Sequence, residues 1–148
     1  MNQQRSTLRV TATSGETATA FVRRQQFAAG RPLQFDVEYP QVTPLEYALG
    51  AVGAEIVNGV RAIAKRRRIV IDAIEAVVHG DLDNPLAYFD VVGIEGHPHL
   101  RRIVLTLYVA SPAPSGSVHE LWKATQSKLP LARAFTAAGL LDVTLTLV

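Results

Sequence analysis

Glu55 is the residue whose type and position most need a chemical explanation. It lies within Tyr47 to Val60, a nearly apolar stretch that is interrupted only by Glu55 and Asn58. An unpaired carboxylate that is withdrawn from water is costly, so this side chain must be paired, hydrogen-bonded or protonated. A buried carboxyl group can act as a general acid or base, but a bond to an arginine or a hydroxyl can also hold it in a structural role. Asn58 lies about one helical turn further along and can reach the same side.

The other residue types that carry chemistry are absent or poorly arranged. The chain contains no cysteine, which excludes a disulfide, an iron–sulfur cluster, a thiolate zinc site and a cysteine nucleophile. His97 and His99 offer two imidazoles, which His79 or Glu95 would have to complete as a metal site. Pro98 separates the pair and no third ligand stands at a known spacing, so a polar loop is the favoured interpretation. We expect no metal and no cofactor.

Charge and hydropathy favour a cytoplasmic protein that binds neither nucleic acid nor membranes. The 15 lysines and arginines and 13 acidic residues leave a net charge of +2, which argues against a dedicated nucleic-acid binder. Residues Met1 to Ser6 are polar, with no signal-peptide stretch behind them. Tyr47 to Val60 is shorter than the about 20 residues that span a bilayer. None of the large aromatic residues is interleaved with a basic stripe, so these are interpreted as core: Phe21, Phe27, Phe35 and Trp122.

A long helix must position Glu55. Thr43 is the predicted N-cap and Pro44 the first helical residue, where its missing N–H costs nothing. The helix is expected to run to about Arg67, with the cations of Lys65 to Arg68 at its C-terminal end. On a helical wheel, bulky apolar residues form one stripe and small residues a second face around Glu55. The stripe contains Leu45, Leu49, Val52, Ile56, Val60 and Ile63, and the small face contains Ala48, Ala51, Gly59 and Ala62.

That helix is apolar around nearly its whole circumference, and two interpretations of it remain open. Either it forms the core of a monomer, or its small face packs against another helix in a dimer that shares its helices. Small side chains allow the second backbone to approach closely.

The remaining segments predict one α+β domain, residues 1–148, with helices packed on an antiparallel sheet. A second helix is predicted from Ser117, where Glu120 completes a capping box, with a break at Leu129 and Pro130. A short helical piece then continues to Ala138, and Gly139 caps it. Strands are predicted at Leu8–Thr13, Glu16–Arg23, Pro32–Glu38, Ile69–Ile71, Ala73–His79, Arg101–Val109 and Leu141–Val148.

The start of the long helix, Thr43 to Glu55 (TPLEYALGAVGAE), resembles the OsmC/Ohr family of osmotically induced and organic hydroperoxide resistance proteins. The likeness continues at Arg61 to Arg67 and at Ser127 to Leu131, and with the strand order it covers nearly the whole chain from Thr11 onward. The resemblance implies an OsmC-like fold and an intertwined homodimer. Two long central helices would then pack between sheets, with the active sites at the subunit interface.

The same resemblance implies that the redox residues of the family are missing here. Glu55, eleven residues after Pro44, stands at the position of the peroxidatic cysteine. Leu129, before Pro130, stands at the position of the resolving cysteine. That reaction needs a thiolate to attack the peroxide oxygen and a second thiol to close a disulfide, and a carboxylate does neither. We therefore expect no thiol-dependent hydroperoxide reductase activity.

The auxiliary groups of the family are also altered. A glutamate often follows the helix-opening proline directly in such enzymes, but this chain has Leu45 there and Glu46 one place later. The N-terminal arginine that would steady the thiolate has its nearest match in Ser14-Gly15-Glu16, which supplies an acid instead.

Three functions follow from this pattern. The favoured one is an OsmC-like homodimer that lacks both redox cysteines and binds a small apolar ligand in the former active-site cleft. The candidate pocket residues are Glu46, Val52, Glu55, Asn58 and Leu129. The second is an enzyme of other chemistry that uses Glu55 as a general acid or base. The third is a structural or regulatory interaction module related to peroxide-stress proteins.

Overall fold

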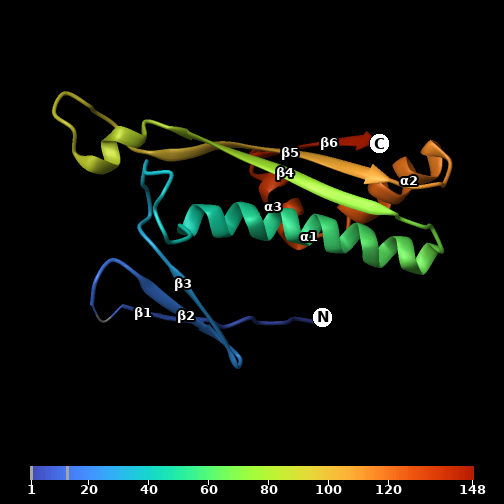
Figure 1. The fold of residues 1–148 in the computed structure, drawn as a ribbon, viewed down its shortest axis with the longest axis horizontal. Coiled ribbons are helices and arrows are strands. Elements are labelled where there is room, and N and C mark those ends of the chain that lie inside the picture. Colours follow the sequence, from blue (N-terminus) through green and yellow to red (C-terminus); the bar gives the residue numbers. More distant parts are fainter. Residues whose placement is uncertain (1, 13) are drawn as a thin grey trace. The chain divides into compact units, whose positions relative to one another are not determined.

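The computed structural model describes residues 2–12 and 14–148, which form two compact units, Met1–Ala48 and Leu49–Val148. Helices and strands occur together in the order shown in Figure 1, which confirms the predicted α+β class. Within the described residues, no helix is both long enough and apolar enough to cross a membrane.

The first unit contains a three-stranded antiparallel sheet in the order β1-β2-β3. Its strands are β1 (Arg9–Thr11), β2 (Ala18–Val22) and β3 (Gln25–Ala29). The first two strands were predicted, although both are shorter than expected and the predicted end at Thr13 lies outside the described residues.

The predicted strand at Pro32–Glu38 is wrong, and β3 lies earlier in the sequence. Arg23 and Arg24 form a two-residue turn, with Arg23 at φ 53, so that Val22 pairs with Gln25. Two arginines carry no turn signal of the Asn-Gly or Gly-X kind. The alternating pattern of 32–38 lacks a buried face, since Phe35 is 62% exposed and Val37 is 98% exposed. Phe35 is therefore not the core residue that we predicted.

Helix α1 (Pro44–Arg67) has the predicted bounds and a capping box at its start. Thr43 donates its backbone N–H to Glu46 Oε2 at 2.8 Å, and the Glu46 N–H donates to Thr43 Oγ1 at 3.2 Å. At the other end Arg68 adopts φ 57, and the Ile69 N–H donates to the Ala64 carbonyl at 2.9 Å. These caps satisfy backbone groups that a helix end would otherwise leave unpaired.

The second unit contains a three-stranded sheet in the order β4-β5-β6. Strands β4 (Ala73–Asp83) and β5 (His99–Ala110) are antiparallel, and the short 3-10 helix η1 (Pro85–Phe89) lies in their connection. Strand β6 (Leu141–Leu147) pairs with β5 in parallel, so the sheet is not antiparallel throughout. The reason is the helical connection between β5 and β6, which carries the chain back to the end where β5 began.

That connection consists of α2 (Ser115–Gln126) and α3 (Pro130–Ala137). The predicted capping box of Ser117 and Glu120 is wrong, because α2 begins two residues earlier. Pro114 is its N-cap, and the Pro114 carbonyl accepts the Ser117 N–H at 2.9 Å. The break at Leu129 and Pro130 and the C-terminal glycine of α3, Gly139 at φ 73, are as predicted.

In the second unit, the helices cover one face of the sheet, and one hydrophobic core lies between the helices and that face (Figure 1). From Ile103 onward, strand β5 alternates between fully buried and half-buried side chains, as expected when one face of a sheet is covered. The buried residues of α1 include the predicted apolar stripe from Val52 onward, together with Gly53 and Ala64, which the stripe did not contain. The core cluster comprises Val52, Ile56, Val60, Ile63, Ala64, Ile103, Leu105, Leu107, Val109, Val118, Leu121, Leu129, Ala132 and Leu141.

Candidate functional site

The carboxylate of Glu55 lies at the start of α3. Its Oε1 accepts the backbone N–H of Leu131 at 3.0 Å, and its Oε2 accepts the backbone N–H of Ala132 at 2.8 Å. A carboxylate is acceptor-only when ionised, so two converging N–H donors match both of its oxygens. The side chain is half-buried. Glu55 is therefore held by backbone of a second helix and not by the arginine or hydroxyl that the sequence suggested.

The local sequence of α3 explains why it needs this acceptor. Its N-cap residue, Leu129, has an extended backbone and no side chain that accepts a hydrogen bond. Pro130 follows at the first helical position and has no N–H. The N–H groups of Leu131 and Ala132 are thus two of the donors that this helix leaves without an intrahelical partner. A negative charge is also favoured at this end of a helix dipole, so Glu55 serves α3 as a capping group from a distant part of the chain.

Gly59 provides the second contact between α1 and the start of α3. A Cβ atom added to Gly59 would lie 2.5 Å from Leu129 Cδ2 and 3.4 Å from Thr125 Cγ2. The buried Leu129 side chain therefore occupies the space that any larger residue at position 59 would need. Glu55 and Gly59, one turn apart on α1, together dock the α2–α3 junction.

The structure brings Glu55 and Leu129 to this junction and places the other predicted pocket residues elsewhere. Val52 is fully buried in the core, and Asn58 is exposed. Glu46 belongs to the capping box of α1. None of these five residues lines either of the two cavities described next. A ligand pocket built from them stays a prediction.

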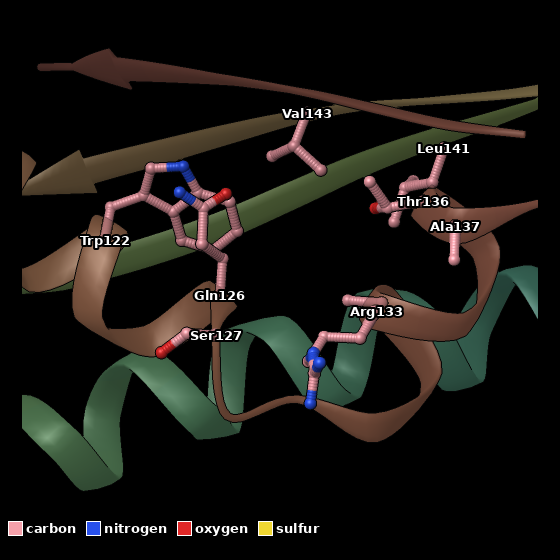
Figure 2. Close-up of a pocket in the computed structure, with 9 residues that line it drawn as sticks. Trp122, Gln126, Ser127, Arg133, Thr136, Ala137, Leu141 and Val143 are labelled. Carbon is pink, nitrogen blue, oxygen red and sulfur yellow. The ribbon is translucent and has the colours of Figure 1, made fainter. Parts of the chain in front are cut away.

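The first cavity has a volume of about 360 Å³ and lies between α2, α3 and β6. Figure 2 shows Trp122 and Gln126 of α2 on one side, Thr136 and Ala137 of α3 on the other, and Val143 of β6 between them. This cavity was not predicted from the sequence, because Trp122 was interpreted as a core residue and Arg133 was given no role. The break in the predicted helix at Pro130 was the sequence feature that indicated a cavity. Two helices that meet at a proline leave a gap between them that side chains must fill.

A second cavity of about 440 Å³ lies at the C-terminal end of α1, and its lining is Arg61, Ala62, Ala64, Lys65, Ile69 and Ile71. Among residues 2–12 and 14–148, no three histidine or acidic side chains are grouped so that they could hold a metal ion. His99 instead lies near Asp83, with 3.4 Å between Nε2 and Oδ2.

Solved structures with the same arrangement of elements identify the fold. An OsmC-like protein from Mycoplasma pneumoniae superposes with a TM-score of 0.79 at 16% identity, over 99% of this chain and 98% of that chain. The chain has the OsmC-like fold. An organic hydroperoxide resistance protein OsmC from Legionella pneumophila gives 0.68 at 14% identity, over 98% of both chains. The organic hydroperoxide resistance protein OhrB of Bacillus subtilis gives 0.61 at 21% identity, over 96% of this chain and 98% of that chain.

These OsmC-like structures confirm, at the level of the fold, the resemblance predicted from the start of the long helix. No family model and no curated protein matches the sequence. Identities of 11% to 21% among the similar structures show a shared fold and leave the reaction open. Within that fold this chain has no cysteine.

Proposed function

We propose that this protein is a cytoplasmic, homodimeric OsmC-like protein of one domain that binds a small apolar ligand and does not reduce hydroperoxides. The observation that supports the proposal best is the pairing of Glu55 with the backbone of α3. By resemblance, Glu55 stands where hydroperoxide-reducing relatives carry their reactive cysteine. In this chain the residue at that position holds two helices together.

The chemistry at this position argues against peroxide reduction. Reduction of a hydroperoxide by a thiol transfers oxygen to sulfur, and the resulting sulfenic acid condenses with a second thiol. A carboxylate accepts no oxygen atom, and Leu129 offers no thiol. Both oxygens of Glu55 already accept hydrogen bonds, which also favours a structural role over general acid–base catalysis.

Consumption of organic hydroperoxide tests this part of the proposal. The purified protein is incubated with cumene hydroperoxide and an excess of dithiothreitol, and peroxide is measured against time. We expect the rate to equal that of a protein-free control, whereas a thiol peroxidase added to the same mixture consumes the peroxide. Turnover above the protein-free control that follows protein concentration would contradict the proposal.

The first unit supports the homodimer, because it cannot build a core from its own residues. Among its described residues, Ala20 is the one hydrophobic side chain that is buried. Leu8 and Val10 remain 48% and 63% exposed. Small units are marginal on their own, and below about 40 residues a metal, disulfides or a second chain are usually needed. With no cysteine in the chain, coverage by a second copy is the proposed solution.

A further inference from the structure

We propose that the cavity between α2, α3 and β6 binds a small amphipathic carboxylate, with an aliphatic body and a single negative charge. This inference rests on the proposed binding of a ligand with an apolar body, and it adds a location and a negatively charged group on that ligand. The volume of about 360 Å³ lies at the lower end of the range of about 300 to 1,000 Å³ that is typical of small-molecule sites.

The walls of the cavity supply the apolar part of the recognition. Ala132 and Leu141 line the cavity but are buried, with 4% and 7% of their surface exposed. The apolar surface open to a ligand therefore comes mainly from the half-buried Trp122 and Val143 and the exposed Ala137. An aliphatic chain would displace water from these surfaces, which favours binding by about 0.8 kcal/mol for each CH₂ group that is fully buried.

Arg133 supplies the charge. It lies at the edge of the cavity, in Figure 2 opposite Val143, and no acidic side chain among the described residues pairs with it. A guanidinium group binds a carboxylate with two parallel hydrogen bonds. Gln126 and Thr136 line the cavity from its two opposite sides and add polar side chains that can donate.

The distribution of charge around the cavity favours a singly charged anion. The lining contains one cation and no acid. Asp142 lies between Leu141 and Val143 in sequence, but alternation along β6 turns it to the opposite face, where Arg102 Nε donates to its Oδ2 at 2.9 Å. A single guanidinium with no second cation suits a carboxylate better than a phosphate dianion.

Trp122 makes the test direct, because it is the only tryptophan of the chain and it lines the cavity. The full-length protein is titrated with octanoate, and in parallel with 1-octanol, while tryptophan fluorescence is recorded. Backbone amide shifts of Thr136 and Val143 in nuclear magnetic resonance spectra provide a second readout. We expect saturable changes with octanoate in both signals, and weaker binding of 1-octanol by about tenfold.

Two variants separate the charge from the cavity. Arg133→Met should weaken octanoate binding by about tenfold and leave 1-octanol binding unchanged. Ala137→Phe should fill the cavity and weaken both ligands. Arg67→Gln removes an exposed cation from α1 and should change neither. Equal affinity for octanoate and octanol, or octanoate binding that survives Arg133→Met, would overturn the assignment of the charge.

The outcome also separates this inference from the proposed function. Octanoate that shifts amides elsewhere in the spectrum, and leaves the Trp122, Thr136 and Val143 signals unchanged, overturns the location and leaves the binding function standing. Turnover of hydroperoxide overturns the proposed function, whatever octanoate does. The absence of any saturable signal with octanoate overturns the site.

Discussion

At the scale of single residues, two side chains on α1 explain how the α2–α3 junction is held. Glu55 contributes acceptors and Gly59 contributes space. The two contributions differ. A substitution at Glu55 can remove hydrogen-bond acceptors without changing the volume of the side chain, whereas a substitution at Gly59 can add volume without changing polarity. Substitutions at the two positions therefore test different physical terms.

Gly59→Ala should destabilise the protein although alanine favours helices. The helix propensity gained is about 1 kcal/mol, but the new methyl group would meet Leu129 at 2.5 Å, and overpacking typically costs about 1 to 3 kcal/mol. Leu129→Ala alone should cost about 2 to 5 kcal/mol because it leaves a cavity. In the double variant the methyl group occupies that space, so we expect a loss smaller than the sum by about 1 kcal/mol or more.

Chemical denaturation of the four proteins measures this cycle. Gly116→Ala is the matched control, since a Cβ atom at this helical glycine of α2 would meet nothing within 4 Å. It should leave the free energy of unfolding unchanged or raise it slightly. Additive losses for Gly59→Ala and Leu129→Ala would show that the two residues are not in contact.

The residue scale also shows what could be predicted from the sequence. The unusual position of Glu55 was visible, because an acid in an apolar helix needs a partner. Its actual partners were not, because they are backbone groups 76 and 77 residues away, and a backbone N–H has no signature in the sequence. The sequence of the partner helix did contain an indication, because α3 begins at Leu129-Pro130 without any side chain that can cap it.

At the scale of elements, the predicted bounds of helices were correct where neighbouring residues in the sequence decide them. The bounds of α1 follow from Thr43, Pro44 and the cluster of cations at its end. The break before α3 follows from Pro130. The failures came where pairing decides the structure, as in 32–38, whose alternating residues find no neighbouring strand. The parallel pairing of β6 likewise depends on the path of the chain and not on the residues of the strand.

Helix α3 is the element that depends most on its neighbours. It has eight residues, fewer than the about 12 to 15 that make an isolated helix even marginally stable in water. Its stability must therefore come from burial of residues such as Ala132 and from the acceptors of Glu55. Because α3 also carries Arg133 and Thr136, the shape of the proposed binding cavity depends on the same two hydrogen bonds.

At the scale of the whole molecule, the proposed homodimer would cover surfaces that a single chain leaves exposed. Helix α1 presents an exposed stripe of small residues that includes Ala51, Ala54 and Ala62. The small face predicted from the sequence was Ala48, Ala51, Gly59 and Ala62. Of these, the three alanines are exposed, whereas Gly59 packs against Leu129 of the same chain. Small side chains on an exposed helix surface allow a second helix to approach closely, and the proposed homodimer would use them and would also cover the sparse core of the first unit.

We expect a dimer at micromolar concentration in sedimentation velocity. Ala54→Arg places a long charged side chain on the exposed stripe of α1 and should shift the protein towards monomer, while Ala134→Arg, at an exposed position of α3, should leave the dimer intact. Specific dimers bury about 1,200 to 2,000 Å² in total, so an arginine at the contact is expected to be disruptive. A wild-type monomer at these concentrations would rule out the shared helices.

Amide hydrogen exchange at the start of α3 tests the central claim, that Glu55 holds this helix. The exchange of the Leu131 and Ala132 amides is followed in the wild-type protein, in Glu55→Gln, and in Glu120→Gln as a control at an exposed glutamate of α2. Glutamine keeps the size of the side chain but presents one acceptor in place of two. We expect Glu55→Gln to accelerate exchange at these amides by about tenfold, which corresponds to about 1.4 kcal/mol. We expect Glu120→Gln to have no effect. Unchanged protection of both amides in Glu55→Gln would contradict the structural role assigned to Glu55.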